Sequence, residues 1–97
     1  MTKDVNVAAV WDAVMARWPF TRTRVDQAVI TDHLEQPRAG QVKVEISYGS
    51  RTVRLRLFHG DRLIQHWDML SGGPIQSIDP KLAELGAQLA TLGIEER

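Results

Sequence analysis

The sequence predicts a single α+β domain over residues 1–97, in which two helices pack on the apolar face of a four-stranded antiparallel β-meander. Three observations predict this class: a helical apolar repeat near the start, alternating polar and apolar residues in the middle, and a second helical repeat near the end. The length of 97 residues suits one domain with a modest core.

The first predicted helix runs from Val7 to Trp18, where apolar side chains recur along one face. Asp4 or Asn6 would cap its start, and Pro19 would end it, because the residue before a proline is displaced from helical geometry. Alanines occupy most of the remaining circumference. Two interpretations therefore stay open: a core helix of the monomer, or a helix with a second buried face against another subunit.

The next segment leads into the predicted sheet. Residues 20–24 are expected to form a connection that carries two arginines. Residues 25–34 are interpreted as the first strand of the meander because they are rich in β-branched residues, although their apolar spacing also fits a short helix. Residues 36–40 contain proline and glycine and are expected to form a loop.

The most regular pattern lies between Val42 and Leu57, where apolar and polar residues alternate strictly. Such alternation is typical of half-buried antiparallel strands. Gly49-Ser50 is predicted as a two-residue hairpin loop, because glycine supplies a positive φ. This loop places Ile46 opposite Val53 and keeps the apolar pairs on one face.

The same register defines the outer, polar face of the sheet. It places Glu45 opposite Arg54 and Lys43 opposite Arg56, and the second of these is a like-charge pair that costs stability. Phe58 shares this face. Three interpretations of this pattern stay open. The arginines protect an aggregation-prone strand from aggregation, or the face binds a protein, or it binds nucleic acid.

The second turn, around Gly60, allows two registers. A two-residue loop, Gly60-Asp61, would direct His66 and Asp68 inward, whereas a three-residue loop would direct Trp67 inward, because a slip of one residue exchanges the two faces. We prefer the three-residue loop, which places Leu63, Gln65, Trp67 and Met69 inside. The strand over residues 62–70 is expected at the sheet edge, open to a further strand, and Trp67 is either a core or an interface residue.

The second predicted helix starts at Asp79-Pro80, with Asp79 as the cap and proline in the first turn. A leucine repeat forms its apolar stripe, and Gly93 ends it. The small residues Ala83, Gly86 and Ala90 form a neighbouring stripe. Glycine weakens a helix interior, so close approach of another backbone, from the first helix or a symmetry mate, would explain it. We interpret this stripe as a candidate dimer interface.

Catalytic and metal-binding patterns are weak. His59 and His66 are each followed two residues later by an aspartate, and Asp32-His33 is a third such grouping. Turn preference explains Asp61, and an enzyme would need both His59 and His66 to line one pocket with a carboxylate. Neither a P-loop lysine nor a nucleophile elbow is present. The sequence thus predicts no enzyme, no cofactor and no metal.

Composition limits the remaining functions. Twelve basic and twelve acidic residues cancel, so no overall field attracts nucleic acid or an anionic membrane. The chain has no cysteine, which suits the cytoplasm, and no apolar run long enough for a membrane span. We therefore expect a cytoplasmic, homodimeric protein-binding module, with nucleic-acid binding as the alternative. The residues expected to bind the partner are Lys43, Arg54, Arg56, Phe58 and His66.

Overall fold

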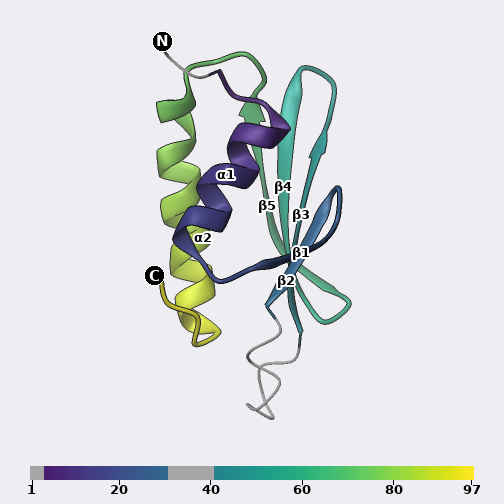
Figure 1. Ribbon diagram of the computed structural model, residues 1–97, viewed down its shortest axis with the longest axis vertical. Coiled ribbons are helices and arrows are strands. Elements are labelled where there is room, and N and C mark those ends of the chain that lie inside the picture. Colours follow the sequence, from purple (N-terminus) through teal and green to yellow (C-terminus); the bar gives the residue numbers. More distant parts are fainter. Residues whose placement is uncertain (1–3, 31–40) are drawn as a thin grey trace.

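The computed structural model describes residues 4–30 and 41–97 and has two layers, a five-stranded antiparallel sheet and a pair of helices on one of its faces (Figure 1). The predicted α+β class is confirmed, and so is the position of both helices. The strands follow the sequence order β1-β2-β3-β4-β5. Their bounds are β1 Thr21–Arg24, β2 Gln27–Ile30, β3 Val42–Tyr48, β4 Thr52–His59 and β5 Arg62–Leu70. The helices are α1 Val7–Arg17, the 3-10 helix η2 Ile75–Ile78 and α2 Asp79–Thr91.

Helix α1 begins and ends where the sequence predicts. The side chain of Asn6 caps it by accepting a hydrogen bond from the backbone N–H of Ala9 at 2.8 Å. Trp18, the residue before the proline, has an extended conformation with φ −132° and ψ 152°, so the helix stops there. One face of α1, including Val10, Trp11 and Val14, is buried against the sheet and α2.

Strand β1 is a fifth strand, in a segment that the sequence led us to expect as a connection. It pairs with β2, and both form a hairpin around a tight turn. The Arg22 guanidinium stabilises this hairpin, because it donates to the backbone oxygen of Val25 at 2.6 Å and lies 4.9 Å from the ring centre of Trp11. The predicted strand over residues 25–34 corresponds to β2. Residues 31–34 and the predicted loop 36–40 lie outside the described residues.

The predicted register of the β3–β4 hairpin is wrong by two residues. Ile46 lies opposite Leu55, and Tyr48 opposite Val53, so pairing extends towards Gly49, whose N–H donates to Thr52 at 2.8 Å. A shift of two preserves the faces, so Ile46 and Val44 keep apolar partners, whereas Val42 comes opposite His59. The turn lies one residue further on, and the positive φ of 60° belongs to Arg51 rather than to a glycine.

The β4–β5 hairpin combines the two registers left open by the sequence. His59 lies opposite Arg62, so the loop is the two-residue Gly60-Asp61 and the preferred three-residue loop is wrong. Phe58 lies opposite Leu63, but the next residue, Leu57, lies opposite Gln65. Ile64 is therefore an extra residue on β5, a β-bulge. This bulge exchanges the faces.

Beyond the bulge, β5 has the face assignment that the preferred register predicted. Trp67 and Met69 are buried, and His66 and Asp68 are exposed. Leu63 precedes the bulge and is exposed, contrary to the prediction. Trp67 is therefore a core residue, and its indole N–H donates to Glu84 of α2 at 3.0 Å.

Helix α2 starts differently from the prediction. Because η2 already holds Ile78 in a helical conformation, Asp79 is the first residue of the helix rather than its cap. Its carboxylate still lies in the first turn, where it favours the helix dipole, and it pairs with Arg17 at 3.4 Å. Gly93 ends the helix with φ 81°, as predicted.

Candidate partner-binding surface

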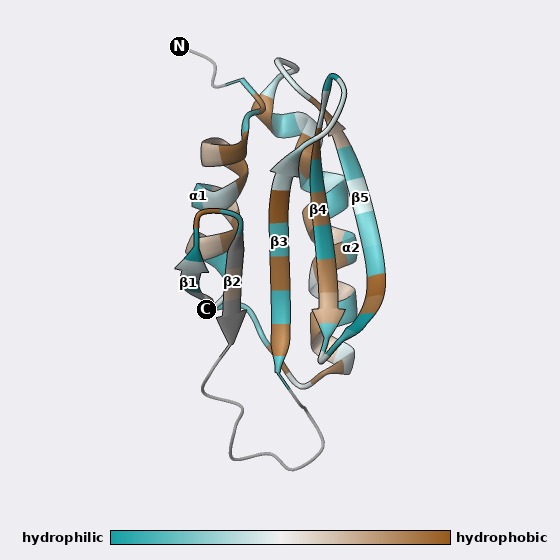
Figure 2. Ribbon diagram, turned by 90° about the vertical axis from the view of Figure 1, so that its right-hand side faces the viewer, coloured by the Kyte–Doolittle hydropathy of each residue, from teal (hydrophilic) through white to brown (hydrophobic). Residues whose placement is uncertain are grey.

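The face of the sheet opposite the helices, called the outer face here, is not covered by any described element (Figure 2). It is formed by alternate residues of the three longest strands. The outer-face residues are Lys43, Glu45 and Ser47 on β3, Thr52, Arg54, Arg56 and Phe58 on β4, and Leu63, His66, Asp68 and Leu70 on β5.

At one end of this face, a lysine covers an aromatic ring. Lys43 lies directly opposite Phe58, and its ammonium nitrogen is 4.5 Å from the ring centre. The same nitrogen is 3.8 Å from Glu45, whose other oxygen is 3.9 Å from Arg56. Glu45 thus joins two cations, and the predicted like-charge pair between Lys43 and Arg56 is wrong. The two-residue shift of the hairpin separates these cations.

In the middle of the outer face, Arg54 and Asp68 form a bidentate ion pair across β4 and β5. The guanidinium nitrogens lie 2.7 Å and 3.2 Å from the two carboxylate oxygens. The hydrogen bond from Arg54, with its positive charge, holds the pKa of Asp68 below its usual range. The same hydrogen bond and the negative charge of Asp68 raise the pKa of Arg54.

The structure brings together all five residues expected to bind the partner, Lys43, Arg54, Arg56, Phe58 and His66. They occupy three adjacent strands, with His66 opposite Arg56. Sequence reasoning missed Asp68 as the partner of Arg54, because that pairing depends on the bulge at Ile64. A bulge leaves only a weak signal, an alternation that changes phase within a strand.

Two exposed leucines of β5 were also missed by sequence reasoning. Leu63 is 45% exposed and Leu70 is 65% exposed, one at each end of the strand. Their register positions, opposite Phe58 and Thr52, place both on the outer face. The outer face therefore has charged pairs in its middle and an exposed leucine at each end of its β5 border.

The small-residue stripe on α2 has a partner within the chain. A side chain at Gly86 would come within 3.2 Å of Cζ2 of Trp18, which explains the glycine without a second subunit. The close approach comes from a side chain at the end of α1. Ala83 and Ala90 are exposed, and their contact with another copy stays a prediction.

The two described histidines do not share a pocket. His59 lies opposite Val42, a core residue, whereas His66 lies on the outer face opposite Arg56. Within residues 4–30 and 41–97, no group of three or more His, Cys, Asp or Glu side chains is arranged to hold a metal ion. The Asp32-His33 pair lies outside the described residues.

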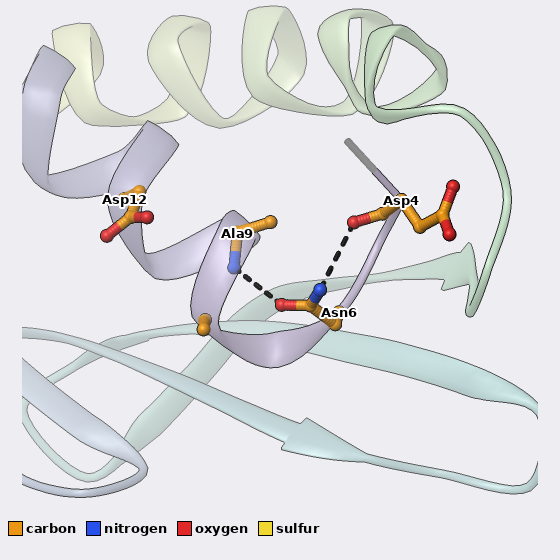
Figure 3. A pocket seen from close by; sticks show the side chains of 5 residues that line it. Asp4, Asn6, Ala9 and Asp12 are labelled. Carbon is orange, nitrogen blue, oxygen red and sulfur yellow. Dashed lines mark hydrogen bonds between the residues drawn. The ribbon is translucent and has the colours of Figure 1, made fainter. Parts of the chain in front are cut away.

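A shallow hollow at the start of α1 is lined by two aspartates and small residues. Asn6 also lines it: its side chain accepts a hydrogen bond from the backbone N–H of Ala9 at 2.8 Å and donates one to the backbone oxygen of Asp4 at 3.3 Å. Figure 3 shows the side chains of Asp4 and Asp12 at opposite ends of the hollow, pointing away from each other. This arrangement offers no convergent pair of carboxylates.

Comparison of the chain with protein-family models, with curated proteins and with solved structures gives no match. Among the described residues, neither helix has the length and hydropathy needed to cross a membrane.

Proposed function

We propose that this protein is a non-enzymatic protein-binding module, of an adaptor or regulatory kind, which engages its partner through the outer face of the sheet. One observation carries the proposal: the helices leave this face bare, while each of its Lys and Arg side chains is matched with a carboxylate. The proposed location is the cytoplasm, an expectation that rests on the sequence.

The balance of charge on the outer face favours a protein over a nucleic acid. Lys43, Arg54 and Arg56 stand against Glu45 and Asp68, so three positive and two negative charges leave one net positive charge. Nucleic-acid affinity comes largely from cations that neutralise phosphates. Here those cations would first have to leave carboxylates. A protein partner with charges of both signs complements the existing pattern.

Apolar contacts would supply the centre of such an interface. Protein interfaces are enriched in aromatic residues and arginine and have an apolar core with a polar rim. Phe58 lies beneath Lys43, and Leu63 lies opposite Phe58 on the neighbouring strand. This cluster lies beside Arg56, which supplies the planar donor group common at interface centres.

A comparative pull-down from the source cell tests the proposal. The baits are wild type, Arg54→Glu/Arg56→Glu and Phe58→Ala, and the last variant keeps every ion pair. Lys81→Glu on α2 is the matched control, because it makes the same kind of charge change on the helical side. Captured proteins are quantified, and the selected one is purified for an affinity measurement.

We expect both outer-face variants to weaken binding at least about tenfold, which corresponds to about 1.4 kcal/mol, and the control to bind as wild type does. Circular dichroism verifies that each bait is folded. Equal affinity for wild type and Phe58→Ala, together with equal capture by the double variant, would move the partner away from this face.

Nucleic-acid binding is the second candidate, and the Lys43–Phe58 stack is the observation that favours it. A base could stack on Phe58 while the lysine contacts a phosphate. Fluorescence anisotropy with single- and double-stranded probes at low salt separates the two candidates. We expect no binding at about 50 µM protein, because the paired cations release few counterions. Salt-dependent binding below that concentration would favour nucleic acid.

A further inference from the structure

The two edges of the sheet are protected very differently. Strand β1 has four residues, and Arg22 and Arg24 are both held in contacts of their own. Strand β5 has nine residues, and its protective features, Arg62 and the bulge at Ile64, lie at its start, whereas residues 65–70 are regular and contain neither lysine nor proline. Long edge strands are usually blocked by such residues, because their unpaired backbone groups recruit further strands. The β5 edge is therefore a surface for strand addition.

We propose that the occupant of this edge is β5 of a second copy of the chain, paired antiparallel about a twofold axis at Trp67. The two five-stranded sheets then become one continuous sheet. A twofold contact is self-complementary, so each residue of the strand must suit the residue that the axis places opposite it.

Charge along β5 selects this register. Beyond the bulge at Ile64, the strand is regular, and His66 and Asp68 alternate on the outer face. An axis at His66 would place two imidazoles opposite each other, and an axis at Asp68 two carboxylates. An axis at Trp67 places each His66 opposite Asp68 of the second copy. An imidazole N–H can donate to a carboxylate, and cross-strand pairs of this kind stabilise a sheet.

The pairing leaves the core of each copy intact. Trp67 stays against α2, held by the 3.0 Å hydrogen bond to Glu84, and Gln65 keeps its 3.1 Å hydrogen bond with Gln88. Arg54 bonds both oxygens of Asp68, so the carboxylate is already oriented along the outer face, and each oxygen keeps a further lone pair for an imidazole N–H. Leu70, which is 65% exposed in one copy, lies at the end of the paired segment, beside the bulge of the other copy.

The contact is small, so we expect a reversible dimer. Stable interfaces bury about 1,200–2,000 Å² in total, and a single edge strand offers less. Sedimentation equilibrium between about 1 and 300 µM should therefore show monomer changing to dimer with rising concentration. A monomer throughout that range would overturn the proposal.

His66→Asp is the decisive variant. It places aspartates opposite each other across the axis, whereas Arg56 of the same chain lies opposite position 66 and accommodates the new carboxylate. We expect it to be monomeric where wild type dimerises. Ser50→Asp is the control: it adds the same charge in the exposed β3–β4 turn, outside β5, and should dimerise as wild type does. Dimerisation of His66→Asp equal to wild type would refute the β5 contact.

A mixture provides a gain-of-function test. In a dimer of Asp68→Lys with itself, each lysine would face His66, so this variant should be monomeric. In a mixed dimer with His66→Asp, the new lysine faces the new aspartate, and the remaining His66 faces the remaining Asp68. We expect a heterodimer from two monomeric variants. Absence of the heterodimer, with both variants folded by circular dichroism, would count against the register.

Wild-type amide spectra keep the proposal testable if a variant fails to fold. Concentration-dependent shifts and slowed exchange should concentrate in residues 65–70. Changes concentrated at Ala83 and Ala90 of α2 instead would assign the contact to the small-residue stripe and overturn the β5 dimer. His66 takes part in both proposals, but dimerisation is measured on the purified protein alone and the proposed function by capture of a partner, so failure of either is distinguishable from failure of the other.

Discussion

Gly86 lies in the middle of α2, where glycine ordinarily weakens a helix, and the fully buried ring of Trp18 fills the space that a side chain would need. Helix propensity favours alanine there by about 0.5–1 kcal/mol. The packing opposes it, because Trp18 is enclosed and can yield little. The glycine is thus a product of helix–helix packing within one chain.

Gly86→Ala should consequently destabilise the protein. Overpacking a core costs about 1–3 kcal/mol, which exceeds the gain in helix propensity, so we expect a net loss of about 1 kcal/mol. Urea unfolding measures it. Ala83→Gly, at an exposed position of the same helix, serves as the reference for propensity alone and should cost about 0.5–1 kcal/mol. An increase in stability for Gly86→Ala would show that Trp18 relocates freely.

Asp68 makes the stability of the fold depend on pH. Arg54 lowers its pKa in the folded protein, so the ion pair contributes above the unfolded value of about 3.9, and the contribution disappears as the pH falls through the folded value. The carboxylate is 38% exposed, and solvent screening limits the effect. We expect Asp68→Asn to cost about 0.5 kcal/mol at pH 7.

This difference should shrink towards zero as the pH falls through the lowered folded-state pKa of Asp68, because the carboxylate is then protonated in both states. Urea unfolding of wild type and Asp68→Asn across the range gives the curve. In an Arg54→Met background the pH dependence of the difference should be much smaller, because the donor is gone. A difference that stays constant with pH would indicate that Asp68 acts through packing.

At the scale of elements, the two hairpins show how a turn and a strand share the control of register. Around Gly60 the two-residue loop alone would direct Trp67 outward, and the bulge at Ile64 returns it to the core. Burial of Trp67 and Met69 therefore outweighs regular pairing along β5. Near Gly49 the register moves by two, which keeps the faces and separates Lys43 from Arg56.

Gly60 is the position where the β4–β5 turn depends on its residue type. Its φ is 62°, and the space that a side chain would occupy there is open, so a substitution meets only backbone strain. We expect Gly60→Ala to cost about 1–2 kcal/mol, measured by urea unfolding. Gly60→Asn should cost less, because asparagine tolerates this conformation. Equal costs would show that the turn relaxes to another geometry.

The elements that the sequence predicts well are those with strong local patterns. The bounds of helix α1 could be predicted closely, because Asp4 or Asn6 and Pro19 mark its ends, and the strands β3 and β4 follow from strict alternation. The register shifts and β1 could not. A two-residue slip keeps every residue on its own face, and the contact between Arg22 and Trp11 is visible only once β1 lies beside α1.

At the scale of the molecule, the sequence predicted which residues share the outer face but not how they pair. Alternation alone places Lys43, Arg54, Arg56 and Phe58 together. Their partners depend on register: Arg54 meets Asp68 only because of the bulge, and Lys43 meets Phe58 only because of the hairpin shift. The same set of residues that suggested a cationic surface is, once paired, nearly neutral.

The two ends of α1 are both fastened by segments from the far end of the chain. Val5, just before the helix, exchanges backbone hydrogen bonds with Gly72 and Gly73, and Arg97 donates to the backbone oxygen of Arg17 at its other end. During synthesis, α1 therefore precedes the residues that fasten its two ends, although the strands β1 and β3 that it contacts are made sooner. Because such distant contacts require large loops to close, we expect the two ends of α1 to be fastened late in folding.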